Sequence, residues 1–353
     1  MKITKLVPPP SEKEIINEWI YTDITYVSII CCTYNQELYI SDAINSFLSQ
    51  KTKYKFEIII HDDCSTDNTN DILISFKERY PNIIQIIKPK ENLYSKYGIN
   101  APGLNAISQS LGKYIAFCEG DDFWIDKNKI QAQITTLENN SNINICFTAA
   151  KYFDANNGTI VGNKIAKTNK NIFTLSEVIK NGGDFIPTAS ILVKKETLNT
   201  IPKWFINAPV GDYFLQMYSA KEKGAIYLPL ITTLYRVNSI GSWSSSKNQR
   251  SIEEIIEFQK RMNNSLNLMK IDGFNINDLN YAITNQETIT TIQLIKNGHY
   301  SQAKNNIINS WINNPNINKM QRKLYYLRNI FSILHKLYLI KKILKDKMKF
   351  IYI

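Results

Sequence analysis

Residues 113–126 read KYIAFCEGDDFWID, a run of strand-forming residues that ends on carboxylates. The apolar and aromatic side chains of this run suit a buried strand. Asp121 and Asp122 then follow directly, and two adjacent like charges cannot both be buried without a partner. Either this pair belongs to a solvated turn, or a cation lies between the carboxylates.

Two earlier segments repeat the pattern. YVSIICCTYN (26–35) is an apolar run that ends on Thr-Tyr-Asn, and FEIIIHDD (56–63) is a second that ends on Asp-Asp. Apolar residues at helical spacing follow each run. Strands that alternate with helices predict an α/β fold with a doubly wound, mostly parallel sheet. Ligands bind such sheets beyond the carboxyl ends of the strands, so we expect the three polar clusters to form one site.

The second half of the chain changes character. AIYLPLITTLYRV (225–237) is extended, and Pro229 predicts an edge strand or a bend there. VGDYFLQMYSAKEKG (210–224) predicts a helix that begins near Asp212, and from about residue 251 the pattern is helical to the end. We expect an N-terminal lead over 1–24, an α/β domain over 25–250 and a helical C-terminal extension over 251–353.

The composition is that of a globular protein, with 44% hydrophobic and 21% charged residues in 353. The N-terminal stretch has no apolar core of a signal peptide, and no stretch of 18 apolar residues predicts a membrane-spanning helix. The five cysteines are odd in number and show no CxxC spacing, which favours buried thiols in a reducing compartment. We therefore expect a cytoplasmic location.

The net charge of +11 is concentrated at the C-terminus. Ten basic residues and one acidic residue follow from Lys319 onward, so this tail carries +9. Leu327, Phe331, Leu334 and Tyr338 fall on one helical face within it. Such a basic amphipathic helix binds a membrane surface, or it packs on the α/β domain with its basic face in solvent. No nucleic-acid-binding motif accompanies the charge, so we expect no nucleic-acid partner.

The paired carboxylates suit one particular chemistry. A nucleotide diphosphate can lie beside them only if a divalent cation neutralises both sides. Mg²⁺ and Mn²⁺ take hard oxygen ligands, which are commonly one or two carboxylates together with phosphate oxygens and water. An Asp-Asp pair at the end of a strand supplies part of such a site.

Three segments together resemble the family-2 glycosyltransferases, which have the GT-A fold: VSIICCTYNQELYISDAINSFLSQ (27–50), FEIIIHDDCSTDNT (56–69) and LGKYIAFCEGDDFWIDKNKIQAQ (111–133). They look most like bacterial enzymes that build surface polysaccharides such as capsule or lipopolysaccharide. The resemblance covers roughly residues 25–245, and its first 140 residues are the most specific.

The resemblance implies roles for individual residues. Thr33 and Tyr34 would lie against the nucleotide base, and Asp63 would accept a hydrogen bond from the uracil imide. Asp121 would face the ribose, and Asp122 would bind the Mn²⁺ or Mg²⁺ that bridges the diphosphate.

GDYFLQ (211–216) matches the later acidic motif of the family, so Asp212 would be the general base. Sugar transfer with inversion needs such a carboxylate to take the proton of the acceptor hydroxyl. The alternative interpretation of Asp212 is a helix N-cap, which its place before YFLQMY also suits.

One departure concerns LYRVNSIGSWSS (234–245), where the family often has a histidine that binds the metal and this chain has Asn238. An amide oxygen is a weaker Mn²⁺ ligand than imidazole, although Mg²⁺ would tolerate it. Glu119, Arg236, Asn238 and Trp243 are therefore candidates for contacts to the donor or its phosphates.

These observations predict a metal-dependent inverting glycosyltransferase that uses a nucleotide-sugar, with UDP preferred, and a glycan or lipid-linked saccharide as acceptor. The resemblance and the basic tail place it peripherally on the inner face of the plasma membrane. A sugar nucleotidyltransferase is one alternative, although no Gly-rich phosphate loop follows the first strand. A non-catalytic, membrane-docked scaffold of the same fold is the other.

Overall fold

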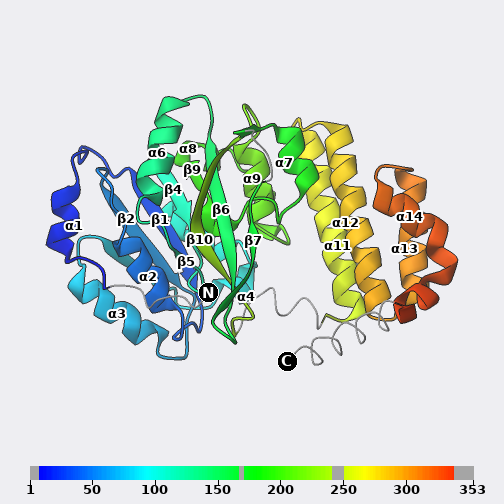
Figure 1. Ribbon diagram of the computed structural model, residues 1–353, viewed down its shortest axis with the longest axis horizontal. Coiled ribbons are helices and arrows are strands. Elements are labelled where there is room, and N and C mark those ends of the chain that lie inside the picture. The colour runs from blue at the N-terminus through cyan, green and yellow to red at the C-terminus, as the bar shows by residue number, and fades with distance from the viewer. Residues whose placement is uncertain (1–7, 167–170, 241–249, 338–353) are drawn as a thin grey trace, which may run out of the picture. The chain divides into compact units, whose positions relative to one another are not determined.

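The computed structural model describes residues 8–166, 171–240 and 250–337 (Figure 1). The chain divides into two compact units, Met1–Gln249 and Arg250–Ile353. The first is built around a sheet, and the second consists of helices among its described residues.

The sheet of the first unit has the strand order β3-β2-β1-β4-β9-β6-β10-β5, with β7 paired to β6 and β8 paired to β10. β1, β2, β3 and β4 are mutually parallel, as are β6 and β10, whereas β5, β7, β8 and β9 pair antiparallel. The strands are β1 (Val27–Thr33), β2 (Phe56–Asp62), β3 (Ile84–Ile87), β4 (Tyr114–Phe117), β5 (Phe123–Trp124), β6 (Ile145–Asp154), β7 (Thr159–Lys164), β8 (Ile172–Phe173), β9 (Leu192–Lys194) and β10 (Ala225–Val237).

Helices connect these strands and cover both faces of the sheet. The helices of this unit are α1 (Glu12–Glu18), α2 (Ile40–Leu48), α3 (Thr69–Arg79), α4 (Leu93–Tyr97), α5 (Ala101–Ser108), α6 (Lys129–Asn139), α7 (Leu175–Asn181), α8 (Lys195–Leu198) and α9 (Asp212–Ser219), with 3₁₀ turns η1 (Thr188–Ser190) and η2 (Lys203–Asn207). One apolar core joins α2, α3 and α6 to alternate residues of β1, β2 and β4, such as Ile29, Ile58 and Ala116. α5 packs on β1 and β2 through its own buried residues.

The predicted mostly parallel α/β sheet with a helical C-terminal part is confirmed. β10 follows the predicted extended segment, and its register against β6 shifts between Leu228 and Thr233. Pro229 lies in this irregular stretch, where the ladder does not need the N–H that proline lacks. The predicted bend is thus a bulge in a paired strand.

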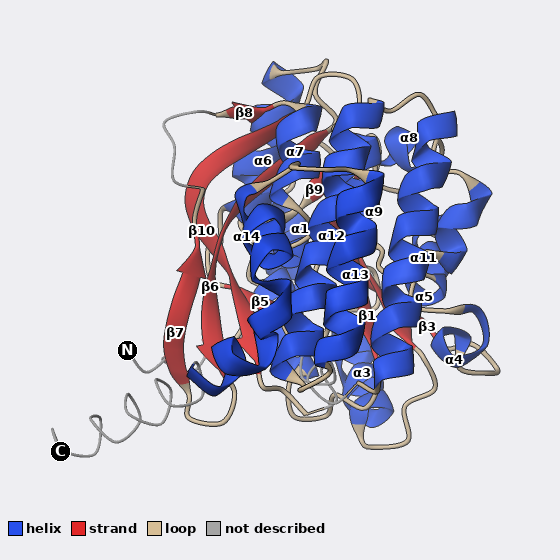
Figure 2. Cartoon of the chain, turned by 90° about the vertical axis from the view of Figure 1, so that its right-hand side faces the viewer, coloured by secondary structure: helices blue, strands red, loops and turns tan. Residues whose placement is uncertain are grey.

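The described α-helices of the second unit are α11 (Ile252–Ile271), α12 (Ile276–Lys296), α13 (Tyr300–Asn313) and α14 (Lys319–Leu327). A 3₁₀ turn, η4 (Arg328–Ile330), follows them. Each of these α-helices packs against the next one in the chain (Figure 2). Residues 331–337 are helical again. The core of this unit is made by Ile255, Leu294, Ala303, Ile307, Leu324 and Phe331.

A lysine is buried behind the acidic turn of the first unit. Lys129, the first residue of α6, is fully buried, and its Nζ donates a hydrogen bond to Oε1 of Gln133 at 2.7 Å. The same ammonium lies 4.2 Å from the ring centroid of Trp124, a cation–π distance. Burial lowers the pKa of Lys129 to about 7, against the opposing influence of Cys118, Cys146 and Asp126.

This lysine makes folding stability depend on pH. Between about pH 7 and the ordinary lysine pKa the unfolded chain holds a proton at Lys129 that the folded chain lacks, so stability rises with pH. We expect the unfolding free energy of the wild type, relative to Lys129→Met, to increase by up to about 1.4 kcal/mol per pH unit above pH 7. Urea unfolding near pH 7 and near pH 9 measures this. Lys127→Met, at an exposed neighbouring position, should show no such trend, and a pH-independent difference for Lys129→Met would contradict the argument.

Candidate functional site

The carboxyl ends of β1, β2 and β4 meet at one edge of the sheet. β1 and β2 stay in parallel register through Thr33↔Asp62, and β4 runs parallel on the other side of β1. The N–H of Asp63 donates to the carbonyl of Thr33 at 3.0 Å, and the N–H of Gly120 donates to the carbonyl of Cys32 at 3.1 Å. The three polar clusters that follow these strands in the sequence therefore share this edge.

Asp122 is buried at this edge with only part of its hydrogen-bonding capacity used. Its side chain is 1% exposed, and Oδ1 accepts a hydrogen bond from the backbone N–H of Arg236 at 2.7 Å. Oδ2 is buried and has no hydrogen-bond partner among the described residues. A buried carboxylate oxygen without a partner is costly, so this atom is suited to a ligand that arrives from outside the chain.

Arg236 fixes the acidic turn from the side of β10. Its two terminal nitrogens donate to the carbonyl of Asp121 and to Oδ2 of Asp42 in α2, both at 2.6 Å. The guanidinium centre lies 4.9 Å from the ring centroid of Tyr39 and 5.0 Å from that of Phe123. Because the protein itself holds this side chain on several sides, the geometry favours a positioning role for Arg236 over the direct phosphate contact that the sequence suggests.

The residues after Arg236 extend this arrangement. Ser239 Oγ donates to Oδ2 of Asp121 at 2.8 Å. Asn238 has a left-handed backbone (φ 61°), and its Nδ2 donates to Oδ1 of Asp154 at 3.2 Å. Trp243, another predicted contact, lies outside the described residues. The metal or donor contact expected of Asn238 stays a prediction.

Gly120 lets the acidic turn pack closely on side chains of the loop after β1. A Cβ at this position would lie 2.2 Å from Oε1 of Gln36 and 3.0 Å from Oγ1 of Thr33, two atoms that themselves share a hydrogen bond of 2.9 Å. The absence of a side chain therefore lets the acidic turn approach the loop after β1, and it brings Asp121 and Thr33 toward one site.

The carboxylates of the turn influence one another. Burial, followed by the charges of Asp121 and Asp212, raises the pKa of Glu119 to about 8. Glu119 is an exposed residue, and the negative charges of Asp121 and Asp212 favour the protonated form of its carboxyl group. Burial also raises the pKa of Asp121, and it raises the pKa of Asp122 well above the ordinary range with help from Asp121 and Glu119. A positive charge placed here would be stabilised by all of these groups.

Asp212 reaches the same region from the second half of the unit. It is the first residue of α9, and the N-cap position belongs to Gly211. Oδ1 of Asp212 accepts a hydrogen bond from the N–H of Tyr213 at 2.7 Å, and Oδ2 accepts one from Oγ1 of Thr188 at 3.2 Å. The carboxylate is half-buried, and its charge raises the pKa of Glu119. Asp212 therefore lies near the acidic turn and also satisfies the helix start.

The carboxylate of Asp63 accepts hydrogen bonds from another part of the chain, which the sequence did not reveal. Its two carboxylate oxygens accept hydrogen bonds from the backbone N–H groups of Leu93 (2.7 Å) and Tyr94 (2.9 Å) at the start of α4. Nδ2 of Asn92 also donates to the carbonyl of Asp63 at 2.8 Å. Asp63 therefore positions α4 at this edge. Each carboxylate oxygen can still accept a second hydrogen bond, so the base contact stays a prediction.

Thr33 and Tyr34, the two remaining residues predicted to contact the base, differ in their exposure to solvent. Thr33 is buried, whereas the side chain of Tyr34 is 49% exposed. Asn35 adopts a left-handed conformation (φ 52°), and its backbone N–H donates to Oγ of Ser65 at 2.9 Å, while its Oδ1 accepts from the N–H of Thr66. The loops that follow β1 and β2 are thereby joined, with the ring of Tyr34 available to a ligand.

Comparison with known proteins places this arrangement in a family. The model of the family described as glycosyl transferase family 2 matches residues 28–201. A glucosyltransferase of Escherichia coli, WfgD, is 33% identical over 223 residues, which are 63% of this chain and 80% of WfgD. The chain belongs to glycosyl transferase family 2. The family recognised from the sequence is confirmed.

Other relatives differ in how much of their sequence they share with this chain. The dTDP-rhamnosyl transferase RfbG of Shigella flexneri is 29% identical over 265 residues, 70% of this chain and 87% of that protein. Uncharacterized mycobacterial proteins, among them one from Mycobacterium tuberculosis, are 28% identical over 225 residues. That match spans 62% of their length.

Two solved structures share the fold of this family-2 chain. Staphylococcus aureus TarS 1–349 in complex with UDP-GlcNAc aligns with a TM-score of 0.54 at 17% identity, over 86% of this chain and 91% of that one. A mannosyltransferase from Pyrobaculum calidifontis in complex with GDP-Man and Mn²⁺ aligns with a TM-score of 0.53 at 13% identity, over 91% and 90%. At these identities the likeness shows the fold alone.

The metal-binding capacity of the described residues is limited. No group of three or more His, Cys, Asp and Glu side chains among residues 8–166, 171–240 and 250–337 is arranged to hold a metal ion. Asp122 alone offers a buried carboxylate oxygen without a hydrogen-bond partner at the acidic turn. One carboxylate with substrate phosphates and water is a common environment for Mg²⁺, so Asp122 fits a cation that arrives with its nucleotide.

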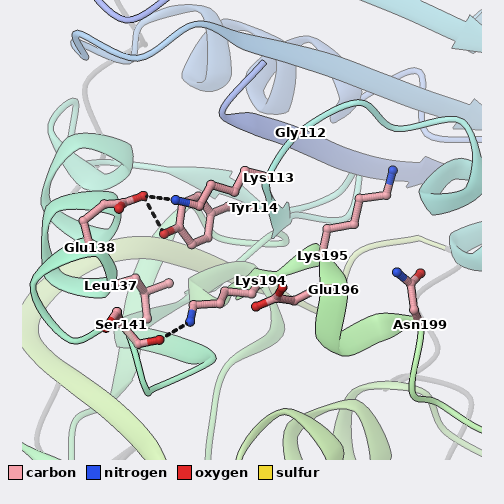
Figure 3. A pocket seen from close by; sticks show the side chains of 10 residues that line it. All are labelled: Gly112, Lys113, Tyr114, Leu137, Glu138, Ser141, Lys194, Lys195, Glu196 and Asn199. Atoms are coloured by element: carbon pink, nitrogen blue, oxygen red, sulfur yellow. Dashed lines mark hydrogen bonds and ion pairs between the residues drawn. The ribbon is translucent and has the colours of Figure 1, made fainter. Parts of the chain in front are cut away.

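A cavity of about 430 Å³ lies elsewhere on the first unit (Figure 3). It is lined at the amino end of β4 by Lys113 and Tyr114, and at the end of α6 by Glu138. The acidic turn follows the opposite, carboxyl end of β4. The Lys113 ammonium is already paired with Glu138 at 2.6 Å, and Figure 3 shows the lysines of the cavity pointing apart. This cavity is therefore separate from the carboxylate site.

The ion pair between Arg236 and Asp42 permits a test of the site's construction. Arg236 is 5% exposed, so Arg236→Met leaves the Asp121 carbonyl and Asp42 without a buried donor and should lower the unfolding free energy by about 2–4 kcal/mol. Asp42 is 44% exposed, so Asp42→Asn should cost less than about 1 kcal/mol. Urea unfolding measures both, and equal effects of the two variants would contradict the positioning role.

Proposed function

We propose that this chain transfers a sugar, with inversion, from a nucleotide-sugar to a saccharide hydroxyl. The observation that carries the proposal is the unpartnered, buried Oδ2 of Asp122 beside Asp121 in a family-2 chain. We propose UDP as the nucleotide. WfgD is named as a UDP-glucose-dependent enzyme and TarS has complexes with UDP and UDP-GlcNAc, which supports this choice.

Different residues are proposed to bind the metal ion, the ribose and the base of the donor. Asp122 would hold a Mn²⁺ or Mg²⁺ ion, which supplies positive charge to the diphosphate that leaves the sugar. Asp121 would accept hydrogen bonds from the ribose while Ser239 fixes its orientation. Thr33, Tyr34 and Asp63 would surround the base, and Glu119 and Asn238 are proposed contacts to the donor.

Asp212 is proposed as the general base. The acceptor oxygen attacks the anomeric carbon, the bond from that carbon to the diphosphate oxygen breaks, and the proton of the acceptor hydroxyl passes to Asp212. The hydrogen bonds from Tyr213 and Thr188 hold the carboxylate in one orientation, which a proton acceptor in an in-line displacement requires.

We propose a glycan or lipid-linked saccharide as the acceptor, in the assembly of a bacterial surface polysaccharide such as capsule or lipopolysaccharide. WfgD is named for an acceptor on diphosphoundecaprenol, which supports this class. Such an acceptor places the chain at the inner face of the plasma membrane. No helix among the described residues combines the length and hydropathy needed to cross a bilayer, so we propose a peripheral association.

The metal-binding role of Asp122 is tested by calorimetric titration of UDP with and without Mn²⁺. We expect binding by the wild type only with Mn²⁺, and a loss of at least about tenfold in affinity for Asp122→Ala, because the remaining carboxylates would repel the diphosphate. Glu78→Ala, which removes an exposed carboxylate of α3, is the control. Metal-independent binding that Asp122→Ala leaves unchanged would overturn the assignment.

The role of Asp212 is tested by separating binding from turnover. With UDP-sugars and a polyprenyl-diphosphate GlcNAc acceptor, Asp212→Asn should lower turnover by about 10²–10⁴-fold while UDP affinity changes little. Thr188→Val, which removes one hydrogen bond to the carboxylate, should reduce turnover to a smaller extent. An Asp212→Asn variant with wild-type turnover would refute the assignment. If the wild type binds UDP in the presence of metal but transfers none of the sugars, the result would favour a non-catalytic scaffold.

A further inference from the structure

The last described part of the helical unit exposes a row of large apolar side chains. Tyr326, Ile330, Ile333 and Leu337 are 68%, 38%, 54% and 58% exposed. They run from the end of α14 through η4 into the helical residues 331–337, and their spacing of four, three and four residues keeps them on one side of this segment. We name this set of four residues the exposed stripe.

The opposite face of the same segment is fixed in the core of the helical unit. Leu324 and Phe331 are buried there, and Leu334 packs against them. Nδ1 of His335 lies 2.8 Å from the hydroxyl of Tyr300 in α13. The segment therefore cannot turn to hide the exposed stripe without losing its core contacts.

This arrangement corrects the surface expected from the sequence. Of the apolar row expected from the sequence, Phe331 is buried and Leu334 is partly buried in the core of the unit, whereas Leu327 is 38% exposed. Tyr338, the last residue of that row, lies outside the described residues. The exposed stripe is a second apolar row, rotated around the helix from the first.

The segment that carries the exposed stripe has basic but no acidic side chains. No Asp or Glu occurs in the sequence between Glu287 and Asp346. Among the described residues of the segment, Lys323 and Lys336 are exposed beside the stripe, and Lys319 and Arg322 are exposed before it. An occupant of this surface must therefore be apolar where it meets the stripe and negatively charged around it.

A bilayer that contains anionic lipids meets both requirements. Its acyl boundary accepts tyrosine, isoleucine and leucine side chains, while its headgroups attract the lysines and arginines. A second copy of this surface would bring like charges together. Nucleic acid would leave the aliphatic side chains in water.

We propose that residues 319–337 dock this chain on an anionic bilayer, with the exposed stripe inserted at the headgroup boundary. The inference rests on the peripheral location given under the proposed function and deepens it by naming the inserting side chains. It also orients the helical unit, because the core-facing residues Leu324 and Phe331 must point away from the lipid.

The test is co-sedimentation of the full chain with vesicles of phosphatidylcholine mixed with phosphatidylglycerol. We expect Ile333→Asp to lower the partition coefficient by at least about tenfold, because a charge replaces an inserted apolar side chain. Ile271→Asp changes an isoleucine of α11 that is 83% exposed and should have little effect. Circular dichroism and melting temperature establish that both variants are folded.

Charge is tested separately from insertion. Lys323→Glu with Lys336→Glu should weaken binding to the mixed vesicles, and added salt should weaken binding of the wild type. Equal binding to vesicles of phosphatidylcholine alone, or equal losses for Ile333→Asp and Ile271→Asp, would overturn the proposal. A dimer in light scattering that Ile333→Asp dissolves would assign the stripe to a second copy instead, and binding of single-stranded RNA that Lys323→Glu abolishes would assign it to nucleic acid.

Vesicle binding is measured without nucleotide or metal, so the result is independent of the transfer reaction. If the chain binds vesicles but not UDP, the proposed docking surface is supported and the proposed function is refuted. If the chain binds UDP with Mn²⁺ but does not bind vesicles, the proposed function is supported and the proposed docking surface is refuted.

Discussion

Two carboxylates at the end of one short strand have to be held close together without being neutralised by the protein. Arg236 meets this constraint indirectly. Its guanidinium binds the carbonyl of Asp121 and the carboxylate of Asp42, and only its backbone N–H touches the side chain of Asp122. The turn is thereby fixed in position while one oxygen of Asp122 keeps its full capacity for a ligand. A direct guanidinium–Asp122 pair would have been more stable by itself and would have occupied the same oxygen.

The same contacts relate distant parts of the first unit. Asp42 lies in α2 and Arg236 near the end of β10, so the acidic turn is held between the first and the last parts of the sheet. Asp212 approaches from α9 and Asp63 from β2, each with hydrogen bonds from backbone N–H groups at a helix start. Carboxylates in such positions gain from the helix dipole, which reduces the cost of gathering them.

Local patterns in the sequence predicted the sheet and the meeting of Thr33, Asp63 and Asp121, because parallel strands necessarily bring their carboxyl ends to one edge. The pairing of Asp42 with Arg236 could not be predicted, since 194 positions separate the two residues and neither has an unusual neighbour. The capping of α4 by Asp63 had only Asn92 as a local signal. In the helical unit, two apolar rows were available, and helical periodicity alone could not decide which of them would face the core.

Gly120 also limits how this chain can vary. A Cβ there must displace the end of the Gln36 side chain and would crowd Ile40 and Thr33, so a substitution at the centre of the turn disturbs the loop after β1. Residues around α4 face no comparable barrier, because α4 contributes no fully buried side chain. Divergence among descendants of this sequence is therefore expected to accumulate around α4 before it reaches the acidic turn.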